Sequence, residues 1–263
     1  MERIYRINNH DLADPYRKVA TNPQLEADLV ENGYAVRERL FSLEEVAALR
    51  QAVDELAEAA GGVGSVGTDV TFGGLFVRSA IEKHPLFWQV ANDPRLLDLA
   101  RTMLGPQVQI HGNVLRITYP GQPNQETHWH FHQRVVPDPI PPFFAYPRVL
   151  DNLIYLDDLD DETGPFCVLP GTHKDITKEL PAGIKTDLPG QVKVIVPAGS
   201  CVTADAAVWH RGMATTEKGR VRRLLIIGYS PTWMKPIDFP SPEFIARHPE
   251  PESRELLGLA GHY

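Results

Sequence analysis

The stretch Glu126-Thr127-His128-Trp129-His130-Phe131-His132-Gln133 carries a histidine at every second position. Because side chains alternate between the two faces of a β-strand, a strand here would present three imidazoles on one face and two aromatic rings on the other. Imidazole binds iron, copper, nickel and zinc, so His130 and His132 are predicted to ligate a metal. A third ligand must come from elsewhere in the chain, and the best candidate is His210, which follows Trp209.

The composition indicates one large domain that is rich in turns. The chain has 263 residues with 23 prolines and 20 glycines, which favours β-structure with long loops over a helical bundle. A formal net charge of −8 attracts neither nucleic acid nor an anionic membrane, and no apolar run is long enough to span a bilayer. The N-terminus lacks the apolar core of a signal peptide and there are only two cysteines, so a cytoplasmic location is expected.

Residues 22–105 are expected to form the helical part of this domain. Ser-Leu-Glu-Glu at 42–45 is a capping box ahead of apolar residues at helical spacing. Asp-Pro at 93–94 predicts the start of a second helix, which ends before a Gly-Pro pair. Residues 33–36 could form a short strand between helices, and the glycine-rich segment 61–74 is equally compatible with a lid and with a plain connector.

Residues 106–230 are expected to form the β-rich core, and residues 231–263 a C-terminal tail. The proline-rich segment 137–147 is predicted to be a loop that shapes a pocket beside the metal strand. Helices followed by many strands indicate a single α+β domain, mainly β, built around a sandwich or barrel. Besides the histidine stretch, strands are predicted at 108–111, 114–119, 148–156, 166–169, 191–196, 199–204 and 222–229.

Three segments are similar to the motifs of a known family. Trp-His-Phe-His at 129–132 stands where the family has Trp-His-x-Asp, and Trp-His-Arg-Gly at 209–212 matches its distal His-Gly. Gly-Pro-Phe-Cys-Val-Leu-Pro-Gly-Thr-His-Lys at 164–174 matches its Asn-Gly…Pro-Gly-Ser-His-Lys segment and is the most specific match. With these motifs the chain resembles, from about Leu25 to Tyr229, the phytanoyl-CoA dioxygenase family of iron(II)/2-oxoglutarate oxygenases, which includes ectoine hydroxylase.

The resemblance implies a double-stranded β-helix, a jelly-roll barrel with the metal in its mouth and the N-terminal helices packed on one sheet. It also implies that Fe(II) and 2-oxoglutarate are the cofactors, that His130 and His210 ligate the iron, and that Arg222 pairs with the far carboxylate of 2-oxoglutarate. A guanidinium suits this role because it can hold a carboxylate through two parallel hydrogen bonds. Arg220 shares the strand face of Arg222, so the register of this arginine is left open.

The chain departs from the family at the metal-binding carboxylate. The usual triad is two histidines and one carboxylate, and here His132 stands in the place of the carboxylate. We therefore expect a metal site of His130, His132 and His210. The alternatives are a pair of His128 and His130, with His132 outside the coordination sphere, or a carboxylate supplied by Glu126. Three imidazoles leave the site one charge unit more positive than the usual triad, so it would still attract a dianionic 2-oxoacid.

The strand that contains Asn113 and Arg116 contributes to the cofactor pocket in this family, and Asn113 is the residue expected to bind the cofactor here. The resemblance thus implies a dioxygenase that uses dioxygen and 2-oxoglutarate to hydroxylate or otherwise oxidise a small molecule. Two other hypotheses stay open at this point. One is a three-histidine metal enzyme that uses no 2-oxoacid, and the other is a non-catalytic metal or small-molecule binding protein on the same fold.

Overall fold

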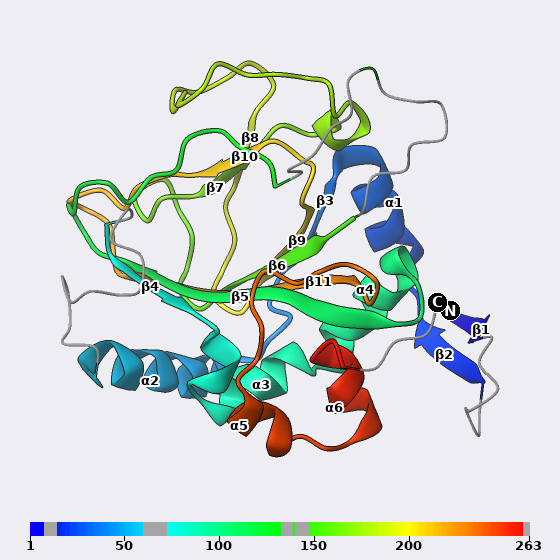
Figure 1. Cartoon of the computed structure of the whole chain (residues 1–263). Coiled ribbons are helices and arrows are strands. Elements are labelled where there is room, and N and C mark those ends of the chain that lie inside the picture. Colours follow the sequence, from blue (N-terminus) through cyan, green and yellow to red (C-terminus); the bar gives the residue numbers. More distant parts are fainter. Residues whose placement is uncertain (8–14, 60–72, 133–138, 140–147, 260–263) are drawn as a thin grey trace.

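Two antiparallel β-sheets face one another in the computed structural model, which describes residues 1–7, 15–59, 73–132, 139 and 148–259 (Figure 1). Most of the predicted segments 61–74 and 137–147 lies outside these residues. The larger sheet has the order β3 (Tyr34–Arg37), β9 (Cys201–Asp205), β6 (Leu150–Tyr155), β11 (Arg222–Pro231), β5 (Val108–Thr118), β4 (Leu75–Arg78). The smaller sheet has the order β10 (His210–Gly212), β7 (Phe166–Val168), β8 (Val192–Val194). This is the expected jelly roll.

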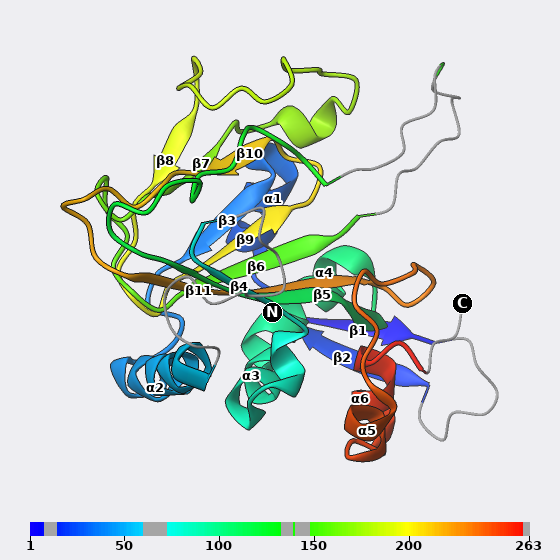
Figure 2. The same ribbon diagram turned by 60° about the vertical axis from the view of Figure 1, so that its left-hand side comes forward.

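Helices cover the face of the larger sheet that points away from the smaller one (Figures 1 and 2). The helices on this face are α2 (Leu43–Ala59), α3 (Pro85–Ala91), α5 (Pro242–Ala246) and α6 (Pro251–Leu256). The helix α1 (Pro23–Asn32) contacts β3, and α4 (Pro94–Leu104) contacts α1, β5 and β11. Short 3₁₀ helices are present at η1 (Ala80–Glu82) and η2 (Thr172–Lys174). The strand β1 (Glu2–Arg6) pairs with β2 (Tyr16–Ala20) in a separate two-stranded sheet. None of the described helices is both long and apolar enough to cross a membrane.

The helix starts predicted from the sequence are confirmed. The amide of Ser42 donates to Oε2 of Glu45 at 2.6 Å, and the amide of Glu45 donates to Oγ of Ser42 at 3.2 Å, which is the reciprocal capping box. Asp93 accepts a hydrogen bond from the amide of Arg95 at 2.8 Å and caps α4. These signals are local, so they could be read without knowledge of the fold.

Alternation along the strands separates two apolar cores. Leu225 and Ile227 of β11 lie in the large core shared with the helices, whereas Leu224 lies in the core between the two sheets. Leu224 pairs with Arg116 of β5 in the antiparallel register. Directly opposed residues point to the same face of a sheet, so Arg116 and every second residue from Arg222 onward face the smaller sheet.

Three expectations need correction. The histidine stretch does not form the predicted strand: His130 makes a single bridge with His210, and the amide of Trp129 instead donates to the carbonyl of Ile184 at 2.8 Å. The segment 231–263 is also more than a tail, because α5 and α6 place Phe244 and other apolar side chains in the core beneath the larger sheet. The strands predicted at 108–111 and 114–119 are one strand, β5.

Candidate metal centre

Three histidines from distant parts of the chain meet at one end of the space between the sheets. His130, His132 and His210 each offer a ring nitrogen, and these atoms all lie within 4.8 Å of one another. The ring centroids of His130 and His210 are 4.3 Å apart, those of His132 and His210 are 4.9 Å apart, and those of His130 and His132 are 5.2 Å apart. The bridge between His130 and His210 sets this geometry, and His132 follows two residues later on the same side.

The same ring nitrogen of each histidine is held by an acceptor. Nδ1 of His130 lies 2.8 Å from the carbonyl oxygen of His128, and Nδ1 of His210 lies 2.9 Å from that of Val208. Nδ1 of His132 lies 2.9 Å from a carboxylate oxygen of Asp151. A carbonyl oxygen can only accept, so Nδ1 carries the hydrogen and Nε2 keeps the lone pair that a metal requires.

His210 is held in its neutral form. Burial lowers its pKa well below the ordinary value, and repulsion from the charged forms of His130 and His132 lowers the pKa further. Neutral imidazole is the form that ligates metals, so the site is prepared for a cation.

The alternative ligands of the histidine stretch are not brought into the cluster. His128 is exposed, and its ring centroid lies 5.6 Å from that of His130. The carboxylate of Glu126 forms an ion pair with Nζ of Lys185 at 3.1 Å. The geometry therefore favours His132 as the third member.

The aromatic residues between the histidines anchor the segment on its other side. Trp129 is buried, and its Nε1 donates to the carbonyl of Thr186 at 2.9 Å. The ring of Phe131 packs against that of Trp209 with a centroid distance of 4.7 Å. The guanidinium of Arg211 lies over the Trp129 ring at 5.6 Å. Imidazoles on one side and aromatic rings on the other are what the alternation predicts, although the backbone is not a regular strand.

Two arginines are buried on the inner face of the larger sheet. Arg222 is 3% exposed, and its Nη1 donates to the carbonyl of Met213 at 3.1 Å and to that of Gly164. Arg116 is 9% exposed and donates to the carbonyl of Gln125. Burial lowers the pKa of both guanidinium groups, and the charge of Arg222 helps to lower that of Arg116 to about 10.

These arginines extend toward the strand of the third histidine. Nη1 of Arg116 lies 4.0 Å from the position that a Cβ atom would take at Gly212, which is two residues after His210. Arg220, the other candidate for the cofactor cation, instead pairs with Asp160 at 2.7 Å, and its side chain is 60% exposed. The register therefore brings Arg222, and not Arg220, into the space between the sheets.

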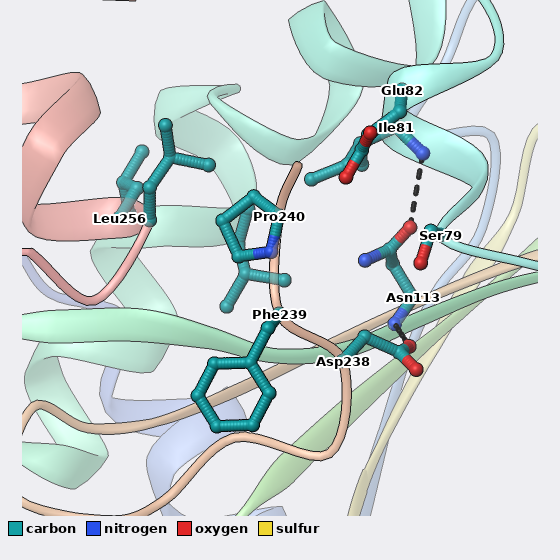
Figure 3. A pocket seen from close by; sticks show the side chains of 10 residues that line it. Ser79, Ile81, Glu82, Asn113, Asp238, Phe239, Pro240 and Leu256 are labelled. Atoms are coloured by element: carbon teal, nitrogen blue, oxygen red, sulfur yellow. Dashed lines mark hydrogen bonds between the residues drawn. The ribbon is translucent and has the colours of Figure 1, made fainter. Parts of the chain in front are cut away.

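Asn113 does not lie near the histidines. Its Oδ1 accepts a hydrogen bond from the amide of Ile81 at 2.9 Å on the helix side of the larger sheet (Figure 3). The cavity at this position measures about 10 Å³, roughly the room that one water molecule needs. This placement does not support the expected cofactor role of Asn113. Arg116, three residues later, faces the opposite side and takes its place as a candidate.

Sequence reasoning missed two residues of the site. Asp151 and Tyr155 of β6 oppose Gly228 and Leu224 of β11, so both face the space between the sheets. Tyr155 is 2% exposed. Burial raises the pKa of its hydroxyl, and the nearby charges of Arg222 and Arg116 offset only part of this rise. No motif marks either residue. Only the alternation of β6, once its register is known, points to them.

Comparison with known sequences identifies the family of the chain. Residues 29–223 match the model of the family described as phytanoyl-CoA dioxygenase (PhyH). An ectoine dioxygenase from Stutzerimonas stutzeri (strain A1501) is 32% identical over 168 residues, which are 60% of this chain and 54% of that protein. An ectoine dioxygenase from Sphingopyxis alaskensis is 34% identical over 151 residues, which are 54% of this chain and 47% of that protein. The chain thus spans about half the length of the curated relatives it matches.

Solved structures share the fold at lower sequence identity. HygX from Streptomyces hygroscopicus, crystallised with nickel and 2-oxoglutarate, is 20% identical with a TM-score of 0.65, and the match covers 82% of this chain and 90% of that one. SnoK, an alpha-ketoglutarate-dependent carbocyclase from nogalamycin biosynthesis, is 22% identical with a TM-score of 0.62, and the match covers 80% of this chain and 84% of that one. The family match spans the three clustered histidines and both buried arginines, and the chain belongs to the phytanoyl-CoA dioxygenase family.

Proposed function

We propose that this protein is an iron(II)- and 2-oxoglutarate-dependent dioxygenase that oxidises a small molecule at a three-histidine metal site. The observation that carries the proposal is the cluster of His130, His132 and His210, with two buried arginines in the same space between the sheets. The names of the curated relatives and the ligands in the HygX crystal structure support the same class of reaction.

The residues present fit these cofactors. Three imidazoles with Nδ1 held by acceptors offer Nε2 to a divalent metal such as iron(II). Within the described residues, Arg222 donates only to backbone carbonyls, so its charge has no carboxylate partner there. A buried charge is costly unless it is paired. A dianion with one end at the metal and the other at Arg222 would supply that pair.

Each group of residues then has a separate task. When bound, iron(II) and 2-oxoglutarate activate dioxygen and supply the oxidising power for insertion of oxygen into a C–H bond. The three histidines hold the metal, while Arg222 and Arg116 fix the far carboxylate and thereby orient the cofactor. Apolar side chains on the inner faces exclude water from the reaction, among them Leu153, Phe166, Val168 and Leu224.

The proposal is tested by measuring the succinate formed from 2-oxoglutarate in the presence of each candidate substrate in a panel of small molecules, beginning with ectoine. We expect turnover that requires iron and dioxygen, is abolished in His210→Ala and is retained in His128→Ala. The second substitution is a matched control, because it removes an exposed histidine of the same segment that lies outside the cluster. Metal binding at one equivalent without 2-oxoglutarate consumption across the panel would contradict the proposed function. Oxidation of a substrate that proceeds without 2-oxoglutarate and is unchanged in Arg222→Gln would favour a three-histidine enzyme that needs no 2-oxoacid.

A further inference from the structure

One of the three histidines differs from the others in what holds its Nδ1 atom. His130 and His210 each use the backbone carbonyl two residues earlier, which is a neutral acceptor from their own segment. His132 uses the carboxylate of Asp151, which is 19 residues away on β6. The histidine at the position of the missing aspartate ligand is thus the one that contacts a carboxylate.

Asp151 is placed to serve this histidine. It opposes Gly228 of β11 and Ala204 of β9, so its side chain faces the smaller sheet. Among the residues that the structure describes, His132 is the only ion-pair partner of Asp151, and the nearby Arg148 pairs with Asp205 at 3.7 Å instead. The negative charge of Asp151 is therefore directed at the histidine cluster.

The larger sheet keeps a space for the carboxylate. A Cβ atom at Gly228 would lie 2.6 Å from Oδ1 of Asp151, a separation that such atoms do not adopt. Gly112, which pairs with Gly228 on the neighbouring strand, is different: a Cβ there would meet Oδ2 of Asp238 and Cβ of Ile237, both at 3.7 Å, which is ordinary contact. An alanine at 228 would therefore force the Asp151 carboxylate to shift, whereas the contacts at 112 tolerate an alanine.

We propose that Asp151, acting through His132, supplies the negative charge that a directly bound aspartate would otherwise bring to the metal. Asp151 is a positioning residue: it fixes the His132 ring with its hydrogen on Nδ1, so that Nε2 is directed at the metal. The inference rests on the proposed metal site.

Charge accounting supports this role. Iron(II) with two imidazoles and one carboxylate carries a net charge of about +1, and with three neutral imidazoles about +2. Adding the carboxylate of Asp151, hydrogen-bonded to one of those imidazoles, returns the total to about +1. Carboxylates that accept from a ligating histidine commonly increase metal affinity by about 10- to 100-fold.

The first test compares iron(II) affinity in anaerobic titrations of wild type, Asp151→Asn, Gly228→Ala and Gly112→Ala. Asparagine keeps an acceptor for Nδ1 and removes only the charge. We expect Asp151→Asn to weaken iron(II) binding by about 10- to 100-fold. We expect Gly228→Ala, which displaces the carboxylate but keeps its charge, to weaken binding less than Asp151→Asn does, and Gly112→Ala to change it by less than about threefold. We also expect the midpoint potential of the bound iron to become more positive in Asp151→Asn, because iron(III) loses the negative charge that stabilises it.

The second test is a double-mutant cycle with His132→Asp, which places a carboxylate directly on the metal. In that background Asp151 would repel the new carboxylate, so Asp151→Asn is expected to leave iron(II) binding unchanged or to tighten it. A purely structural role for Asp151 would instead weaken binding in both backgrounds. Far-ultraviolet circular dichroism of each variant confirms that it is folded.

The outcomes separate this inference from the proposed function. Wild type that binds no iron(II) would overturn both. Wild type that binds iron(II), together with an Asp151→Asn variant whose affinity and potential are unchanged, would overturn only the role of Asp151.

Discussion

Replacement of Arg222 by glutamine is expected to weaken 2-oxoglutarate binding strongly while the fold persists. Arg222 is 3% exposed, so a carboxylate that pairs with it is removed from water. Truncating one partner of such a buried, hydrogen-bonded charge pair costs about 2–5 kcal/mol, and each 1.4 kcal/mol is a factor of about ten in the dissociation constant. The nearby Arg116 retains part of the positive charge, so we expect the lower part of this range, about 30- to 100-fold weaker binding.

The assay is isothermal titration of 2-oxoglutarate into protein saturated with nickel(II), so that no turnover occurs. Arg220→Gln is the matched control, because Arg220 lies two residues earlier, is 60% exposed and pairs with Asp160. Exposed pairs of this kind contribute about 0–1 kcal/mol, and this pair lies away from the proposed cofactor site, so the control should bind 2-oxoglutarate within about threefold of wild type. The reasoning is refuted if folded Arg222→Gln binds as tightly as the control, or if the control weakens binding equally.

Three further changes test individual contacts of the fold. Trp129→Phe removes the hydrogen bond to the carbonyl of Thr186 and should lower the free energy of unfolding by about 1–3 kcal/mol in urea titrations; no change would contradict this anchor. Burial lowers the pKa of His173, so the folded state binds its proton less readily than the unfolded state. The free energy of unfolding should therefore fall as the pH drops below about 6.5. This fall should be steeper in wild type than in His173→Gln, by up to about 1.4 kcal/mol per pH unit. Equal slopes in the two proteins would contradict this prediction. Asp93→Ala should cost about 1 kcal/mol by loss of the α4 cap, whereas a cost near zero would mean that this cap is dispensable.

Local signals in the sequence predict local structure correctly. The capping box at Ser42 and the Asp93 cap involve atoms within three residues of one another, so neighbouring residues alone determine them. The clustering of His130, His132 and His210 also agrees with the sequence, since the family motifs place these residues relative to one another.

Features that depend on register between strands were harder to predict. Asn113 and Arg116 are three positions apart, so they point to opposite faces of β5, and only the pairing of β5 with β11 shows which face is inside. Asp151 could not be identified from the sequence for the same reason, because its position opposite Gly228 is known only from the pairing of β6 with β11. The histidine stretch has the period of a strand, but its amides have acceptors in separate segments. Those of His130 and His132 donate to the carbonyls of His210 and Ala206, whereas that of Trp129 donates to the carbonyl of Ile184, so no regular ladder forms.

The most direct test of the three-histidine site is an anaerobic titration with iron(II) and then 2-oxoglutarate, followed by visible spectroscopy. Wild type and His128→Ala should each bind one equivalent of iron(II) and develop the charge-transfer band of a chelated 2-oxoacid, while His132→Ala should lose the metal or the band. A band that persists at full intensity in His132→Ala and disappears in His128→Ala would show that His128 completes the site. Absence of iron binding in wild type would contradict the metal centre itself.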